Sequence, residues 1–435
     1  MIKTKYLFGV LSLATCLPVF AQDFLSLQQC REMALSYNQD LKAATHKVTA
    51  YEALHRSAKS DLYPKISASG DATYTGNPRE FTFTKSETPW TIRGKHSQYG
   101  IGVNIEQPLY QGGGLRAQVR KSAAEQEQAR LAANLTGSEV ILETDRIYWN
   151  FVACQELLQI ARQYYHTTDS LTRTIAERVE AELTDRSDLL MAEVKRNDAA
   201  YRLRESERQW DIARMTLASF IGLPEESSLQ TDSIVKPLYQ TETQGLQADS
   251  LFQVRPEYGI ASRQIDIQNE QTKINRAKYL PRLTVGATGQ YGSPGYDFHS
   301  DMDPNYQLYA KLSVPVFEWG KRKHQHTADK SRTEMAREQA SKVRDQLTLE
   351  IQVTAHNQDE AVKQVTLTES SVEKAHENSL LSLDQYKEGL VSITEVLDAQ
   401  IYYLEARKNF VTSKYNAQIA RSEYLKASGS FNSFN

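Results

Sequence analysis

Glycine, proline, cysteine and excess charge are all scarce in this sequence of 435 residues. The 20 glycines and 12 prolines are few for the chain length, and because these residues build turns, the elements between turns are expected to be long. The formal net charge of −3 gives no electrostatic reason to expect a nucleic-acid partner. Of the three cysteines, Cys30 and Cys154 lie on the apolar side of helical patterns, where buried free thiols are favoured over a disulfide.

Long apolar runs and catalytic motifs are also missing. Beyond the first residues, no segment approaches the run of about 18 to 20 apolar residues that a membrane helix needs, so any membrane contact is expected through β-strands or the protein surface. The sequence contains no G-x-S-x-G, H-E-x-x-H or Walker motif, so we expect neither an enzyme nor a cofactor. The pair His324 and His326 is too short a signal for a metal site. The basic run 321–326 that contains it suits either lipid headgroups and phosphates at a membrane rim or a solvated helix start.

Residues 1–21 have the pattern of a secretory signal peptide. Lys3 and Lys5 form a basic start, an apolar stretch follows, and Val19 and Ala21 fit the small-residue cleavage pattern. We expect cleavage after Ala21, which implies export. The alternative is a lipoprotein anchored through Cys16, although the threonine before it and the apolar residues after it argue against lipidation.

The remaining chain carries an internal two-fold sequence duplication. Asn38 matches Arg255, Asp188 matches Glu395, and further matches repeat each of these two spacings. The spacing from Asp188 to Glu395 is shorter than the spacing from Asn38 to Arg255. This difference indicates a longer loop in the first copy, between residues 64 and 108. The expected organisation is a signal peptide at 1–21, a first repeat at 22–223, a linker or equatorial segment at 224–247 and a second repeat at 248–435.

Each copy contains two segments in which apolar and polar residues alternate. They lie near residues 66–74 and 99–107 in the first copy and near 283–291 and 306–314 in the second. Alternation over about nine residues is typical of a half-buried strand and also of a transmembrane β-strand. Tyrosines at the strand ends favour an aromatic girdle at a membrane, whereas a soluble hairpin on a helical core explains the alternation equally well.

The segments between the strands have the pattern of long helices. From Leu115 to Ala181 there is no proline and one glycine, which allows a helix of roughly 100 Å. Apolar residues recur with a period near 3.5 from Val140 to Val179, as in a coiled coil, so the helices form either a soluble bundle or a wall around a cavity. Because the smallest transmembrane barrels have about eight strands, four strands in a membrane would require several chains.

These features together resemble the TolC family of outer-membrane channel proteins, over nearly the whole mature chain and in both copies. The resemblance is carried by Leu25 to Asn38, LYP (62–64), YLP (279–281), QPLYQGG (107–113), VPVFEWG (314–320) and, most specifically, GLVSITEVLDA (389–399). It implies a mainly α fold with transmembrane β, in which four strands per chain contribute to a trimeric 12-stranded β-barrel. Long helices would continue it as a coiled-coil helical barrel. Segment 224–247 would form part of an equatorial belt, or it is an ordinary linker.

The same resemblance implies a passive exit channel in the outer membrane of a Gram-negative-type cell, with a periplasmic helical part. The expected partners are further copies of the chain in a homotrimer, a periplasmic adaptor (membrane fusion) protein, an inner-membrane pump of the RND or ABC type, and outer-membrane lipid. The role is either efflux or type I secretion, and the cargo stays open. The rival hypothesis is an exported periplasmic coiled-coil scaffold without a pore. A secreted enzyme is disfavoured because the sequence offers no convergent catalytic side chains.

An acidic pair in the most specific stretch is the predicted pore constriction. Glu395 and Asp398 are three residues apart, which places both carboxylates on one helix face. The resemblance implies that they project into the narrowest part of the channel, where the pairs of three chains would attract cations and gate the pore. The alternative is a solvated helix face. On the strands, Asp71 and Lys311 are the candidates for lumen-facing side chains that bias ion selectivity.

Residues near the same helix turn are the predicted gate latch. The resemblance pairs Tyr386 with Asp188, beside Ser187, so that the tyrosine hydroxyl would bond the aspartate. Family members can carry an arginine two residues after the glycine of this stretch, and here that position is Val391. Arg186 either substitutes for the missing arginine or faces solvent.

Overall fold

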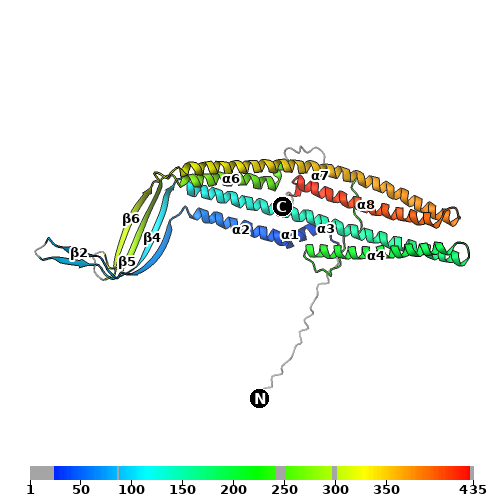
Figure 1. The fold of residues 1–435 in the computed structure, drawn as a ribbon, viewed down its shortest axis with the longest axis horizontal. Helices are drawn as coiled ribbons and strands as arrows, with labels where there is room; N and C mark the ends of the chain where they lie inside the picture. Colours follow the sequence, from blue (N-terminus) through cyan, green and yellow to red (C-terminus); the bar gives the residue numbers. More distant parts are fainter. Residues whose placement is uncertain (1–23, 86–87, 242–250, 296–300, 432–435) are drawn as a thin grey trace, which may run out of the picture. The chain divides into compact units, whose positions relative to one another are not determined.

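The computed structural model describes residues 24–85, 88–241, 251–295 and 301–431, so the predicted signal peptide and Cys16 lie outside it. The described chain is mainly helical and contains one sheet of four long strands, as the sequence predicts (Figure 1). None of its helices combines the length and the apolar character needed to cross a membrane. The helices are α1 (Leu27–Tyr37), α2 (Gln39–Ser60), α3 (Gly114–Glu180), α4 (Arg186–Phe220), the short 3₁₀ helix η1 (Phe252–Val254), α6 (Pro256–Ala277), α7 (Lys321–Lys387) and α8 (Ile393–Ala427).

Helix lengths repeat along the chain with the spacings found in the sequence. Helices α3 and α7 have 67 residues each, and helices α4 and α8 have 35 residues each. Within each pair, the two helices start as many residues apart as Asp188 and Glu395 are in the sequence. Helices α2 and α6 have 22 residues each, and their starts are separated by the same interval as Asn38 and Arg255. The long helix predicted from Leu115 to Ala181 is α3, displaced by one residue at each end.

The chain divides into two compact units, and each unit takes segments from both predicted repeats. Unit 1 consists of Met1–Asn38, Ile141–Thr241 and Asp359–Arg421, and unit 2 of Gln39–Val140, Glu242–Gln358 and Ser422–Asn435. Unit 1 therefore contains α1, α4, the later parts of α3 and α7, and most of α8. Unit 2 contains the sheet, α2, α6 and the earlier parts of α3 and α7. The units differ from the repeats because strand β4 of the first repeat pairs with strand β5 of the second.

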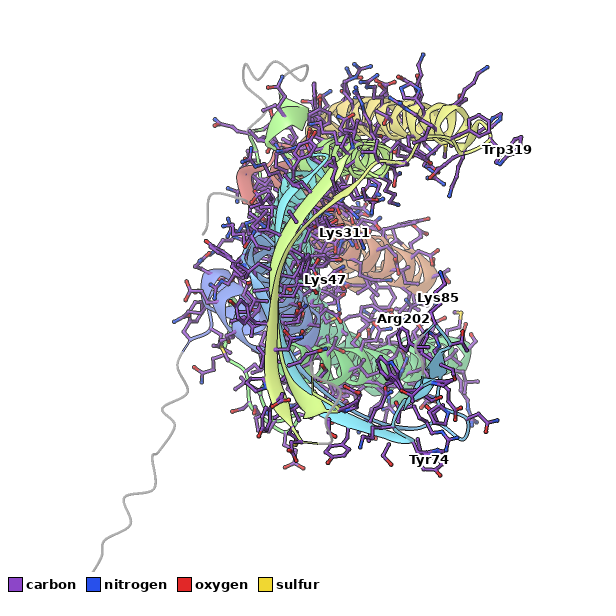
Figure 2. The ribbon with its side chains drawn as sticks, turned by 90° about the vertical axis from the view of Figure 1, so that its left-hand side faces the viewer. Lys47, Tyr74, Lys85, Arg202, Lys311 and Trp319 are labelled. Atoms are coloured by element: carbon purple, nitrogen blue, oxygen red, sulfur yellow. The ribbon has the colours of Figure 1, made fainter. Side chains whose placement is uncertain are left out.

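The sheet of unit 2 has the strand order β1-β4-β5-β6, with antiparallel neighbours throughout. Its strands are β1 (Lys65–Tyr74), β4 (Ser97–Gln111), β5 (Arg282–Ser293) and β6 (Asp303–Ser313), and they overlap the four predicted strands. The pairing of β4 with β5 shifts register between Pro108 and Tyr110, where proline cannot donate a ladder hydrogen bond. Figure 2 shows the sheet as a curved layer.

The two faces of this sheet differ in polarity, because side chains alternate along every strand. One row of paired residues across the four strands is apolar, and it consists of Ile66, Ile105, Ala287 and Leu308. The next row is polar, and it consists of Ser67, Asn104, Thr288 and Gln307. The apolar face is uncovered in the described chain, since Ile66 is 72% and Leu308 is 76% exposed.

The longer loop of the first repeat contains a second hairpin, β2 (Glu80–Phe83) with β3 (Trp90–Arg93), which is not among the predicted strands. Phe83 stacks on Trp90 with ring centroids 4.4 Å apart, on the face opposite the Glu80–Arg93 ion pair. Each strand has only four residues, and alternation over so short a run gives little signal.

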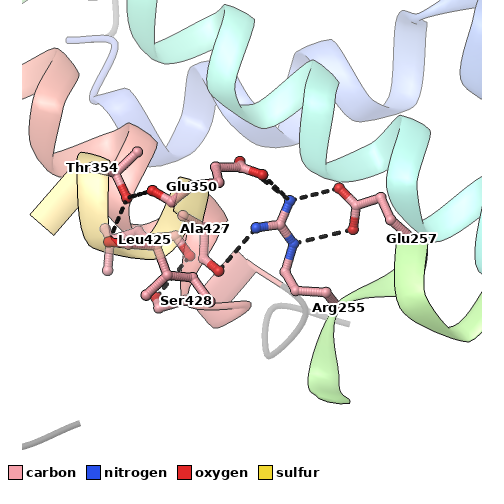
Figure 3. Close-up of polar contacts among 8 residues, drawn as sticks. Arg255, Glu257, Glu350, Thr354, Leu425, Ala427 and Ser428 are labelled. Carbon is pink, nitrogen blue, oxygen red and sulfur yellow. Dashed lines mark hydrogen bonds and ion pairs between the residues drawn. The ribbon is translucent and has the colours of Figure 1, made fainter. Parts of the chain in front are cut away.

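A buried cation joins three helices of unit 2. Arg255, at the N-cap of α6, donates to the carbonyl of Ala427 at 2.9 Å and to both oxygens of Glu257, at 3.1 and 2.6 Å (Figure 3). Its Nη2 also lies 3.3 Å from a carboxylate oxygen of Glu350 on α7. The Arg255 side chain is 2% exposed, and the hydrogen bonds of its guanidinium offset the cost of burying the charge. The start of α6 and the end of α8 are thereby tied to α7.

Residues 224–241 form no helix or strand, yet they are fastened to the helices of unit 1. The backbone N–H of the buried Val235 donates to Glu156 at 3.0 Å, and the same carboxylate pairs with Lys414 at 2.6 Å. Tyr239 donates to Glu369 of α7 at 2.9 Å. The described part of the predicted segment 224–247 is therefore packed, and residues 242–247 lie outside the structure.

Both cysteines of the described chain are free, in agreement with the prediction. Cys30 is fully buried on α1, and Cys154 is partly buried on α3. Burial raises the pKa of the Cys30 thiol to about 12, because a thiolate would lose its hydration there.

Candidate functional site

The two helix turns of unit 1 have the same backbone geometry. At the end of α7, Gly389 has a φ of +75°, its N–H donates to the carbonyl of Tyr386, and the N–H of Leu390 donates to the carbonyl of Gln385. This pair of bonds is a Schellman motif, which satisfies the last carbonyls of a helix. The end of α3 has the same two bonds, and Glu182 there has a φ of +59° in place of the glycine. The turns therefore occupy equivalent positions in the two repeats, but the first one holds a strained non-glycine residue.

The helix ends at these turns share one apolar core. Its buried members come from α3, α4, α7 and α8, and they are Leu171, Ile175, Ala192, Tyr386, Ile393, Val396 and Leu397. Leu189 and Val391 pack against this cluster. Because residues of all four helices meet here, the two turns are fixed relative to each other within unit 1.

The predicted constriction acids lie on one exposed face in the first two turns of α8. Val396 and Leu397 are buried, and their burial turns both Glu395 and Asp398 towards solvent. Glu395 also has a local role, because its carboxylate accepts from the backbone N–H of Ser392 at 3.4 Å while its own N–H donates to the Ser392 hydroxyl at 3.4 Å. This is a capping box, and the S-x-x-E spacing that encodes it was visible in the sequence. Glu395 thus stabilises the start of α8 whether or not it lines a pore.

The predicted latch is not formed within the described chain. Asp188 accepts a hydrogen bond of 2.6 Å from Thr184, four residues earlier. The hydroxyl of Tyr386 is buried and has no hydrogen-bond partner among the described residues. Ser187 and Arg186 are exposed at the start of α4. A bond between Tyr386 and Asp188 stays a prediction for the assembled protein.

The cation next to Tyr386 is Arg178 of α3, which is not among the predicted latch residues. Its guanidinium carbon lies 5.0 Å from the centroid of the Tyr386 ring, within the range of a cation–π contact. The Nε atom of Arg178 is buried and has no hydrogen-bond partner among the described residues. Arg178 is therefore a cation close to Tyr386 that comes from α3 and not from the turn that holds Val391. No sequence signal finds it, because the contact depends on how α3 packs against α7.

The two candidate strand residues lie on the polar face of the sheet. Asp71 is opposite Gly100 of β4, and Lys311 is opposite Thr284 of β5. Both side chains are exposed. The structure thus places both side chains on one face of the sheet, as the alternation predicts. The surroundings of this face depend on how copies of the chain assemble.

Comparisons with known proteins agree with this architecture. A family model described as outer membrane efflux protein matches residues 30–223 and 250–430. The cation efflux system protein CusC of Escherichia coli strain K12 is 23% identical over 421 residues, which cover 91% of this chain and 84% of CusC. The toluene efflux pump outer membrane protein TtgF of Pseudomonas putida is 24% identical over 417 residues, covering 91% of this chain and 81% of TtgF. The solved structure of the outer membrane channel CmeC of Campylobacter jejuni matches with a TM-score of 0.80 at 18% identity, over 93% of this chain and 85% of CmeC.

Proposed function

Because this chain belongs to the outer membrane efflux protein family, we propose that three copies of it form a passive exit channel through the outer membrane and the periplasm. As a member of that family the chain is an outer-membrane efflux protein, and its helical part is periplasmic. The channel carries out no chemistry. Energy comes from an inner-membrane pump of the RND or ABC type, through a periplasmic adaptor that meets the helix turns of unit 1.

The observation that carries the proposal is the sheet of unit 2. Its apolar face exposes Ile66, Ile101 and Leu308 on β1, β4 and β6 and Tyr291 on β5, and a lipid-facing surface requires such exposed apolar side chains. Strands β1 and β6 are its edges, and an unpaired edge in lipid leaves backbone groups unsatisfied at several kcal/mol each. Pairing β6 of one copy with β1 of the next removes both edges. Three copies then give a 12-stranded barrel, the number three coming from the family resemblance.

The paired helices supply the periplasmic tunnel. Equal lengths of α3 and α7, and of α4 and α8, support an origin of the chain by duplication of one strand-and-helix unit. In a trimer these helices form a coiled-coil helical barrel that continues the sheet. Residues 224–241, which pack on the helices of unit 1, form part of an equatorial belt around it.

The helix turns of unit 1 form the gate. Glu395 and Asp398 line the narrowest point, where three exposed acidic pairs surround one axis and attract cations. Tyr386, Asp188 and Ser187 hold the closed state across neighbouring helices. Arg178, in contact with the Tyr386 ring, supplies the positive charge that Val391 lacks. On the strands, Asp71 and Lys311 face the lumen and bias ion selectivity.

The relatives do not identify the substrate that this channel transports, since CusC is named for cations and TtgF for toluene. Both remain models for the transport role only. The rival function, an exported coiled-coil scaffold without a pore, leaves the exposed apolar face of the sheet without a purpose.

Planar-bilayer conductance of the purified protein tests the proposal. Wild type should give discrete channels with a cation preference and a block by divalent cations. In Glu395→Gln/Asp398→Asn both the preference and the block should weaken. A control variant, Glu373→Gln/Glu377→Gln, removes the same charge from exposed positions of α7 and should behave as wild type. Channels indifferent to the first variant would make the acidic pair part of a solvated helix face, with Glu395 limited to its capping role. Folded protein without channels would favour the scaffold.

A further inference from the structure

The junction between β6 and α7, residues 314–326 and hereafter the junction segment, contains apolar side chains that are exposed to solvent to an unusual extent. Val316 is 93%, Phe317 is 69% and Trp319 is 89% exposed. The rings of Phe317 and Trp319 meet edge to face with centroids 4.9 Å apart, so they form one aromatic surface. Figure 2 shows Trp319 projecting outward beside the start of α7.

The backbone at Trp319 is strained. Its φ is +46°, in the left-handed region that non-glycine residues avoid. The corresponding residue of the first repeat is Gly112, with a φ of +62°. A Cβ at Gly112 would lie 2.7 Å from the carbonyl oxygen of Ala277, so only glycine fits there. At Trp319 the chain keeps the same turn but holds a bulky exposed indole in it, which indicates a role for the side chain.

Three cations follow in the first turn of α7. Lys321, Arg322 and Lys323 are exposed, and that turn contains no acidic residue. Within the described chain none of the three forms an ion pair. Cations at a helix N-terminus oppose the helix dipole, so they destabilise the helix locally. The corresponding segment of the first repeat, residues 114–116, carries one cation, so this concentration of charge belongs to the second repeat alone.

We propose that the junction segment is a docking surface for anionic phospholipid headgroups at the periplasmic edge of the outer membrane. The inference rests on the proposed function, which puts the exposed face of the sheet in lipid. Two features argue for this occupant. The aromatic surface directly continues β6, whose Leu308 and Leu312 are exposed on the apolar face. An indole at that level prefers the boundary between acyl chains and headgroups, and unpaired lysine and arginine complement lipid phosphates.

The test compares lipid binding of two matched variants of the full-length protein. Detergent-solubilised trimers are titrated with phosphatidylglycerol and with phosphatidylcholine, and bound lipid is counted by native mass spectrometry. Lys321→Gln/Arg322→Gln/Lys323→Gln should bind phosphatidylglycerol about tenfold more weakly or worse, with phosphatidylcholine unchanged. The control Arg337→Gln/Lys342→Gln/Arg344→Gln removes the same charge from exposed sites further along α7 and should bind as wild type. Equal binding by wild type and the first variant, or equal losses in both variants, would overturn the proposal.

A second measurement addresses the aromatic surface. In vesicles containing phospholipid brominated near the headgroup, wild-type tryptophan fluorescence should be quenched more strongly than that of Trp319→Phe, because the indole lies at the bromine depth. Equal quenching would overturn the placement of Trp319. Bilayer conductance keeps the two proposals apart. A protein that forms channels but shows no lipid preference fails only this inference, whereas folded protein without channels fails the proposed function.

Discussion

Arg255 is the residue whose replacement we expect to destabilise unit 2 most. Its side chain is 2% exposed, and the guanidinium donates to Glu257, Glu350 and the carbonyl of Ala427. In Arg255→Met these acceptors lose their donor while much of the side-chain volume is kept. Removing one partner of a buried ion pair costs about 3 to 5 kcal/mol. We expect the lower end, about 3 kcal/mol, because Glu257 and Glu350 keep 23% and 39% exposure and water can solvate them.

The assay is denaturant unfolding of the full-length protein in detergent, with the midpoint compared at constant slope. Hydrogen exchange should locate the loss at the start of α6 and the end of α8. The matched control is Arg263→Met in α6. The Arg263 side chain is 44% exposed and pairs with Asp266, so this replacement should cost less than about 1 kcal/mol. Equal unfolding midpoints for wild type and Arg255→Met at pH 7 would refute the reasoning.

The same cluster predicts an acid-sensitive stability. Burial opposes ionisation of Glu257, but the hydrogen bonds and charge of Arg255 outweigh it, so the pKa of Glu257 lies below its ordinary value. A lowered pKa in the folded state stabilises the fold above the unfolded pKa of about 4.3, and this contribution is lost as the pH falls through the folded pKa. The free energy of unfolding of wild type should therefore fall below about pH 4, and the fall should be smaller in Arg255→Met.

Three further predictions concern the turns and the free thiol. Glu182→Gly should raise the free energy of unfolding by up to about 1 kcal/mol, because glycine relieves the left-handed strain. Gly389→Ala should lower it by about 1 to 2 kcal/mol, because alanine introduces such strain. A lower unfolding midpoint for Glu182→Gly than for Gly389→Ala would contradict this. Tyr386→Phe should leave the free energy of unfolding unchanged or raise it by about 1 kcal/mol, because it removes a buried hydroxyl without a partner among the described residues. A clear loss of stability measured in the trimer would instead reveal a hydrogen bond formed on assembly. Since the pKa of Cys30 is raised to about 12, a thiol reagent at pH 8 should label it only after unfolding; fast labelling of native protein, followed by mass spectrometry, would be inconsistent with its burial.

Elements with long periodic patterns were predictable from the sequence. Alternation near 66–74 corresponds to β1, and the proline-free run from Leu115 corresponds to α3, because an element with one apolar face repeats its apolar side chains with the period of its backbone. The strands of β2 and β3 are too short for such a pattern, and their pairing depends on a loop closing on itself. Division into two compact units was equally hidden, since it follows from contacts between the repeats.

For the candidate site, the sequence predicted which residues share a helix face, but it did not predict which side chains touch one another. It placed Glu395 and Asp398 on one helix face, and the structure exposes both because Val396 beside them is buried. It did not reveal the contact of Arg178 with Tyr386, which joins residues of two different helices. Side-chain periodicity carries no information about which helices become neighbours.

The sequence by itself determined the extent of α3, the position of the four long strands, the polarity of each sheet face and the family, because these depend on local period, turn residues and motifs in the order of the chain. Only the tertiary structure decided which repeat pairs with which along β4 and β5, that Arg255 is buried among three helices, and that Trp319 occupies a left-handed turn in full exposure. Those outcomes depend on packing between residues far apart in sequence, where many arrangements satisfy the same local pattern and the total burial and hydrogen bonding select one.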